Sequence, residues 1–308
     1  MSFKYCITFL LLQTAFLFLN AQSYHKTKSL DTYVLTETTS LSWFNEPLVA
    51  LNYAMNIPSP VKTTTMRAGF ILPMNAYKSS IGGYFVRDDQ NGVFTQTQVQ
   101  LKYSYKLKVN RMFTLEPGFQ GGFKINAKNY GNLTFQDGTS FNNELLYIPQ
   151  FGFGSSLIYN KNQFYSIGIN QIFNDQGKLF DPSSITINLA YFANFKHQVG
   201  NHLSNIQPMF VFSYNQVNPT LFYGIRGMYR NIFGGFYVNQ NMFFNMNSVT
   251  VLLGTYIGPY HIYYTYDINL YKNLSFLNGF NSNEVTFLMK IRYKNDKRKR
   301  KAIKCPDL

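Results

Sequence analysis

The chain has 308 residues, a formal net charge of +14, 18% aromatic residues and only 14% charged residues. This length suits either two soluble domains or one large barrel, but a soluble fold would have to bury dozens of Phe and Tyr rings while presenting few charges to water. A membrane barrel avoids both demands, because lipid and the membrane–water interface accept aromatic side chains.

Residues 1–21 have the features of a secretory signal peptide. Lys4 precedes an uncharged, mostly apolar stretch at 5–19, and the small residue Ala21 marks the expected cleavage point. The apolar stretch is shorter than the roughly 20 residues of a membrane-spanning helix, so an uncleaved anchor is the less favoured alternative. Export argues against nucleic acid as a partner for this basic chain. It also leaves Cys305 as the only cysteine, which excludes an intramolecular disulfide.

Residues 22–47 form a polar lead-in, and residues 48–294 alternate in the manner of barrel strands. Between 95 and 109 one phase carries apolar side chains such as Val99 and Leu101, whereas the other carries polar ones such as Gln100 and Lys102. Since successive side chains of a strand point to opposite faces, the pattern predicts an all-β transmembrane antiparallel β-barrel of about 14 strands. The segments lie near 48–57, 62–72, 79–88, 93–107, 111–124, 147–159, 162–173, 184–198, 203–216, 220–231, 233–245, 248–257, 260–272 and 284–294.

The stretch at 231–266 carries no charged residue, so a membrane-spanning helix has to be considered there. Such a helix would place Asn239, Gln240 and Asn241 in hydrocarbon with few partners, and Gly258 and Pro259 would weaken it further. Strands satisfy their backbone groups in lipid only when the barrel is closed. The sequence therefore favours a barrel here too.

Motifs for catalysis or for metal and cofactor binding are weak. His197 and His202 lack a third ligand at metal-site spacing, and the glycine-rich stretch at 152–156 lacks the last glycine of a dinucleotide loop. No nucleophile and acid–base set clusters in the sequence, so a barrel enzyme such as a lipase or protease is the least favoured class. We expect no enzymatic activity and no cofactor.

Several cations fall on the polar phase of their predicted strands and are therefore expected to face the lumen. They could line an anion-selective channel for small solutes, which is the alternative function. They could instead pair with Glu116, Asp267 or Glu284 and fill the interior with a polar network, which is the favoured interpretation. The cations are Lys102, Lys106, Arg226, Arg230, Lys290 and Arg292.

Residues 295–308 form a basic tail beyond the last strand. An even number of strands returns both termini to one side of the membrane, which for such barrels is the periplasm. A basic block beside a membrane can be a solvated end, or it can bind acidic lipid head groups or an acidic partner. The residues expected to bind a partner are Lys297, Arg298, Lys299, Arg300, Lys301, Lys304, Cys305 and Pro306.

Five stretches in this order resemble the PorP/SprF family of Bacteroidetes outer-membrane proteins, which belong to the type IX secretion and gliding machinery. They are 148–154 followed by 165–168, Gln207-Pro208, the strands from 223 to 237, 264–267, and 283–286 at the start of the last strand. The family's early Asn-Pro segment is reduced here to 44–47 and 51–54, which suggests a divergent paralogue. The resemblance implies a non-enzymatic barrel in the bacterial outer membrane, in contact with its lipid, that helps to secrete or display cargo proteins with C-terminal sorting domains. It also implies contact with periplasmic and lipoprotein components of the secretion machinery.

Overall fold

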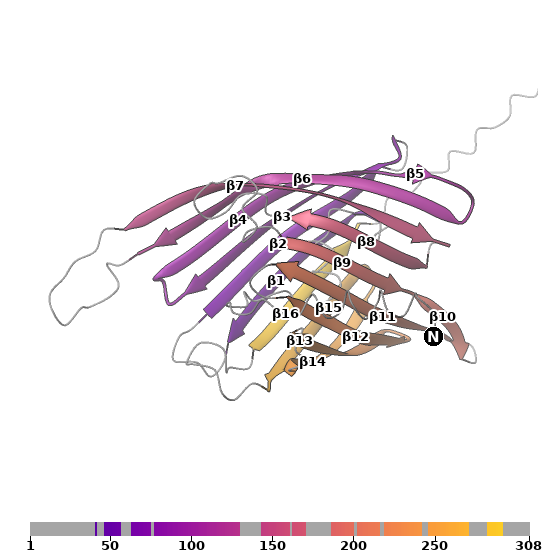
Figure 1. Ribbon diagram of the computed structural model, residues 1–308. Coiled ribbons are helices and arrows are strands. Elements are labelled where there is room, and N and C mark those ends of the chain that lie inside the picture. The colour runs from indigo at the N-terminus through magenta and orange to yellow at the C-terminus, as the bar shows by residue number, and fades with distance from the viewer. Residues whose placement is uncertain are drawn as a thin grey trace, which may run out of the picture.

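Sixteen antiparallel strands close into a barrel (Figure 1). The structure, a computed structural model, describes residues 41, 46–56, 63–74, 77–129, 143–160, 162–170, 186–199, 202–215, 219–241, 246–270 and 282–291. The strands are β1 (Leu48–Asn56), β2 (Thr63–Met74), β3 (Ser79–Gln90), β4 (Phe94–Tyr105), β5 (Leu107–Lys108), β6 (Phe113–Lys128), β7 (Glu144–Tyr159), β8 (Gln163–Asn170), β9 (Thr186–Ala193), β10 (Phe195–Val199), β11 (His202–Asn215), β12 (Thr220–Tyr229), β13 (Ile232–Asn241), β14 (Met246–Ile257), β15 (Tyr260–Asn269) and β16 (Ser282–Lys290).

The wall of the barrel contains fourteen continuous strands. β5 continues β4 beyond a break at Lys106, since both pair with β6, and β10 continues β9 beyond Asn194, since both pair with β11. Sixteen strands less these two continuations leave fourteen. The ring closes where β1 pairs with β16, from Leu48↔Lys290 to Asn56↔Ser282. The predicted barrel class and its strand number are therefore confirmed, and each of the fourteen predicted segments overlaps a strand.

Apart from the turn residues 231, 258 and 259, the described residues of the uncharged stretch at 231–266 belong to β13, β14 and β15. The alternative of a helix at this place is wrong, because the backbone of these residues pairs between neighbouring strands. No helix in the described ranges is long and apolar enough to cross a membrane.

The two ends of the barrel differ in the length of their connections. At the end where β1 begins and β16 ends, called the terminal end here, adjacent strands are joined by connections as short as 230–231 and 258–259. Arg230 and Gly258 adopt φ values of 54° and 62° in these turns, as tight hairpins require. The opposite end carries the long connections 129–143, 171–185 and 270–281. In outer-membrane barrels short turns face the periplasm and long loops face the outside, so we expect the terminal end to face the periplasm.

The outer surface of the barrel is apolar over most of its strands. Leu101 is 62% exposed, and Phe119, Leu253 and Val285 on other strands are at least half exposed. These side chains alternate with buried polar ones, such as Lys102 next to Leu101. An exposed apolar surface of this extent is stable only against lipid.

The inner face carries one apolar cluster, called the apolar layer here. Its strand residues include Leu48 at the start of β1, Phe164 near the start of β8, Phe233 near the start of β13 and Leu288 near the end of β16, all toward the terminal end. The full cluster comprises Leu41, Leu48, Ala50, Ile71, Phe164, Ala190, Phe192, Met209, Val211, Phe233, Tyr237, Leu252, Tyr263 and Leu288.

Replacement of Leu101 by Arg tests the assignment of the outer face. Leu101 pairs with residues in the interior of β3 and β6, so Leu101→Arg places a charge deep in the lipid and should cost about 2–4 kcal/mol. Ile257, the last residue of β14, is also exposed but lies at the turn, so Ile257→Arg should cost about 0–1 kcal/mol. Urea unfolding in lipid vesicles, followed by heat-modifiable migration, measures both values. Equal costs at the two positions would contradict the assignment.

Candidate functional site in the polar interior

The inner face beyond the apolar layer is lined by buried polar side chains. Because β-strand side chains alternate, the residues between the lipid-facing positions all point inward. Carboxamides are prominent among them: Gln100, Gln120, Gln150, Asn170 and Asn188 are all buried. This interior is the candidate functional site, because it is the part of the described chain where polar and ionisable groups gather.

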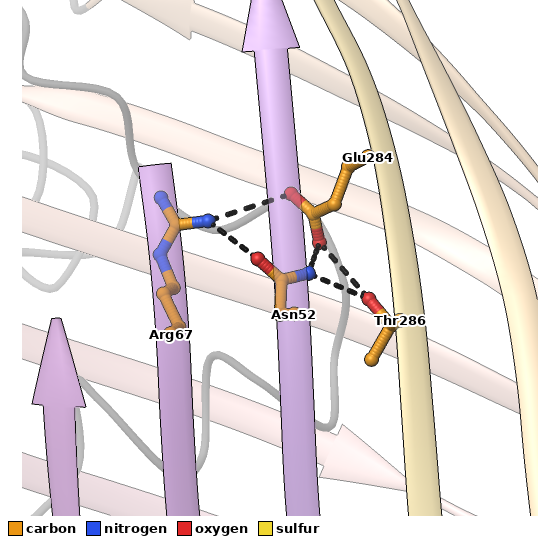
Figure 2. A network of polar contacts seen from close by, with 4 residues as sticks. All are labelled: Asn52, Arg67, Glu284 and Thr286. Carbon is orange, nitrogen blue, oxygen red and sulfur yellow. Dashed lines mark hydrogen bonds and ion pairs between the residues drawn. The ribbon is translucent and has the colours of Figure 1, made fainter. Parts of the chain in front are cut away.

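Four residues form a hydrogen-bonded network where the first and last strands meet, called the seam network here (Figure 2). Asn52 of β1 lies at its centre. Its Nδ2 donates to Glu284 Oε1 at 2.7 Å and to Thr286 Oγ1 at 2.6 Å, both on β16. Its Oδ1 accepts from Arg67 Nη1 of β2 at 2.8 Å, and the same guanidinium nitrogen lies 3.8 Å from Glu284 Oε2.

The register of the three strands brings these side chains together. Asn52 is opposite Arg67 on one side and opposite Thr286 on the other, so the three occupy one cross-strand row. Glu284 is two residues from Thr286 and therefore on the same face of β16. All four are buried, so the charges of Arg67 and Glu284 interact at low dielectric. Each charge offsets part of the cost of removing the other from water. The network ties β2, β1 and β16 together across the closure of the barrel.

Lys102 and Arg226 lie on the inner face and contact neighbouring side chains. Lys102 is 2% exposed, and its Nζ lies 4.9 Å from the centre of the Tyr84 ring. Arg226 is 4% exposed; its Nε donates to Gln207 Oε1 at 2.8 Å, and its guanidinium lies 5.6 Å from the centre of the Phe233 ring. Burial and these contacts hold both cations against the wall of the barrel.

The other predicted lumen cations are placed differently. Lys106 lies at the break between β4 and β5, and Lys290 ends β16 in the inward phase, partly exposed. Arg230 does not lie on the wall: it is exposed in the β12–β13 turn, with its guanidinium 5.4 Å from the Tyr229 ring, because the strand ends one residue before it. Arg292 and the eight tail residues from Lys297 to Pro306 lie outside the described residues.

The three acidic residues considered as partners for the lumen cations are all buried on the inner face. Glu284 lies beside Arg67, a cation that the sequence analysis did not single out. Asp267 accepts a hydrogen bond from Thr250 at 2.6 Å, and Glu116 accepts one from Ser104. Arg67 lies two residues from the buried Thr65 within a predicted strand. The alternation of side chains could therefore have identified Arg67 as an inward-facing cation.

A second polar contact crosses the inner wall over a glycine. Gln120 Nε2 of β6 donates to Asn170 Oδ1 of β8 at 2.7 Å, passing over Gly152 of the intervening β7. A Cβ at Gly152 would lie 2.7 Å from Gln120 Nε2, so a larger residue would displace this amide. The glycine-rich stretch at 152–156 is thus part of β7.

The described part of the chain contains no group of three His, Cys, Asp or Glu side chains that could hold a metal ion. His197 lies on β10 and His202 on β11, where the backbone register places them opposite Ser204 and Val199, respectively.

Comparison with known proteins gives one family and a set of distant barrels. The profile of the family described as "Type IX secretion system membrane protein PorP/SprF" matches residues 17–289. The outer membrane protein Omp33 of Acinetobacter baumannii is 7% identical, with a TM-score of 0.46 over 80% of this chain and 99% of that chain. The toluene transporter TbuX of Ralstonia pickettii is 9% identical, with a TM-score of 0.48 over 84% of this chain and 93% of that chain. None of the curated sequences compared with the chain matches it significantly.

Removal of one charge from the seam network should destabilise the barrel strongly. Glu284→Ala leaves the buried Arg67 without its carboxylate, which should cost about 3–5 kcal/mol of unfolding free energy. Combining it with Arg67→Met removes both charges, so the double variant should lose less than the sum of the single variants. The exposed Lys128–Glu144 pair, with Nζ 2.7 Å from Oε2, is the control: Glu144→Ala should cost at most about 1 kcal/mol. Additive losses at Arg67 and Glu284 in urea unfolding would show that the two do not interact.

Proposed function

Since this chain belongs to the PorP/SprF family of type IX secretion system membrane proteins, we propose that its barrel supports the secretion or surface attachment of cargo proteins with C-terminal sorting domains. The family profile matches most of the chain, from 17 to 289, and this match carries the proposal. The protein is an outer-membrane β-barrel, and its apolar outer surface contacts the membrane lipid. Within the machinery its partners are the cargo and the periplasmic or lipoprotein components.

The proposed attachment to the machinery is the basic tail at 295–308. From Lys294 to Leu308 there are seven Lys or Arg and two Asp residues, a net charge of +5. β16 ends at the terminal end, the side with the short turns, which supports a periplasmic location for the residues beyond it. We propose that residues 297–301 bind an acidic surface of a periplasmic component. Lys304, Cys305 and Pro306 add shape complementarity to this contact, beyond the charge of the basic block.

The interior is better suited to a structural role than to solute conduction. Lys102 contacts Tyr84, Arg226 contacts Gln207, and Arg67 contacts Glu284, so these cations have partners within the wall. We propose that the interior polar side chains stabilise the barrel, and that the protein catalyses no reaction and needs no cofactor. An anion-selective channel is the alternative, and it would require these cations to face open water.

Gene deletion tests the proposed function directly. Loss of the gene should abolish surface display of a cargo that carries a type IX sorting domain, and the full-length gene should restore it. Surface protease accessibility of an epitope-tagged cargo measures display. Unchanged cargo display after gene deletion would refute the role in secretion.

Truncation tests the tail separately. Deletion of residues 296–308 should leave a heat-modifiable barrel in the outer membrane but reduce cargo display, because the docking charge is lost. A variant with Gln at residues 297–301 keeps the length and removes the charge, so a similar loss would assign the effect to electrostatics. If the truncated barrel inserts and cargo display is normal, the tail is only a solvated end. Cleavage of the tail by protease added to intact cells would place it outside and refute the topology.

A further inference from the structure

The two ends of the barrel differ in charge as well as in the length of their connections. The connections at the terminal end, counted with β5, contain six Lys or Arg and no Asp or Glu; they are 75–78, 106–112, 160–162, 200–201, 230–231 and 258–259. The connections at the opposite end contain three Lys and three Asp. Among the described residues of the terminal end, the one exposed carboxylate belongs to Glu46, just before β1. The terminal end is therefore the basic end of the barrel.

Four lysines of this end lie in the inward-facing phase of their strands. They are called the inner rim here and are Lys106, Lys108, Lys196 and Lys290. Lys108 and Lys196 are exposed, and the other two are partly exposed, in contrast to the buried Lys102 and Arg226 further inside. None of the four forms an ion pair within the described part of the chain. Their charges are accessible from water at the terminal end.

The strand register determines the direction of these side chains. Lys106 and Lys108 keep the phase of Lys102, because β5 continues on β6 the register of β4. Lys196 of β10 is paired with the buried, inward-facing Asn205 of β11. The inner rim therefore faces the barrel axis and not the lipid around the wall.

The inner rim approaches the axis from three sides. Its lysines lie at the ends of β4, β9 (continued by β10) and β16, which are separated by four, six and four strand positions in the ring. Neighbouring strands are about 4.8 Å apart, so the three sites lie roughly 19 Å or more apart along the wall. One small anion cannot contact sites at this separation. A flexible chain with several carboxylates can.

We propose that the inner rim binds an acidic polypeptide segment that approaches from the periplasm. Lipid head groups do not fit this position, because they lie outside the wall, where the exposed residues are apolar, such as Leu107 and Phe195. The tail of the protein does not fit either, since its net charge of +5 is repelled by the lysines. The proposal rests on the expected periplasmic position of the terminal end. It does not depend on the role in cargo display, because it is tested on the isolated barrel.

Binding of a fluorescent decaglutamate peptide to the full-length mature protein, in nanodiscs of zwitterionic lipid, tests the inner rim. Fluorescence anisotropy should show saturable binding that weakens as NaCl is raised from about 50 to 500 mM. Lys108→Gln combined with Lys196→Gln should weaken it at least about fivefold. The matched control is Arg87→Gln combined with Lys128→Gln, which removes two cations near the opposite end and should change the affinity less than about twofold.

A second background separates the inner rim from the tail. With Gln at residues 297–301 the peptide should bind more weakly, but the loss caused by the Lys108 and Lys196 substitutions should persist. No binding to the heat-modifiable wild type, equal losses in the two double variants, or a loss that disappears in the tail background would each overturn the proposal.

Photo-cross-linking identifies what the inner rim contacts. In a Cys305→Ser background, benzophenone maleimide on Thr114→Cys, opposite Lys108, should capture the peptide, also in nanodiscs that contain phosphatidylglycerol. The same probe on Gln96→Cys should not, because Gln96 shares the inward phase of Gln100 but lies near the opposite end of β4. Capture of lipid in place of the peptide at Thr114→Cys, or equal capture of the peptide at both positions, would refute the binding site.

Discussion

Backbone hydrogen bonding in lipid is the constraint on which the whole structure depends. Water cannot satisfy a peptide group in the hydrocarbon, so every strand needs a neighbour on both sides. The ring contains fourteen pairs of adjacent strands, and in thirteen of them the two strands follow one another in the chain. The contact between β1 and β16 has no hairpin, and it is here that Asn52, Arg67, Glu284 and Thr286 add side-chain bonds to the backbone ladder.

The alternation of side chains was sufficient to predict the strands and the two faces of the wall. Lipid imposes an apolar outer position at every second residue, and the signal survives even where a strand carries no charge, as in β14. The residue at which a strand ends depends on the turn that follows it, which the alternation does not predict. Arg230 keeps the inward phase of β12 but lies in the following turn, because the hairpin reverses at that residue with a positive φ.

The contacts across the interior could not be predicted in the same way. Arg67 and Glu284 are far apart in the chain, and only the register of β2, β1 and β16 makes them neighbours. Leu41 is a harder case, since the polar sequence before β1 has no strand pattern, yet its side chain is fully buried and contacts the inner wall at Gly82 of β3. The alternation along one strand shows which side chains face lipid and which face the lumen. It does not show which side chains of other strands they will contact there.

Closure by the chain ends also determines when the barrel can form. Asn52 and Thr286 are 234 residues apart, so the contact that completes the ring joins nearly the first and the last parts of the wall to emerge. Contacts of such separation form slowly, and until then β1 presents an unpaired edge that can pair with other chains. The exported chain therefore needs protection of this edge until β16 arrives, and a truncated chain that lacks β16 is an aggregation hazard as well as an incomplete barrel.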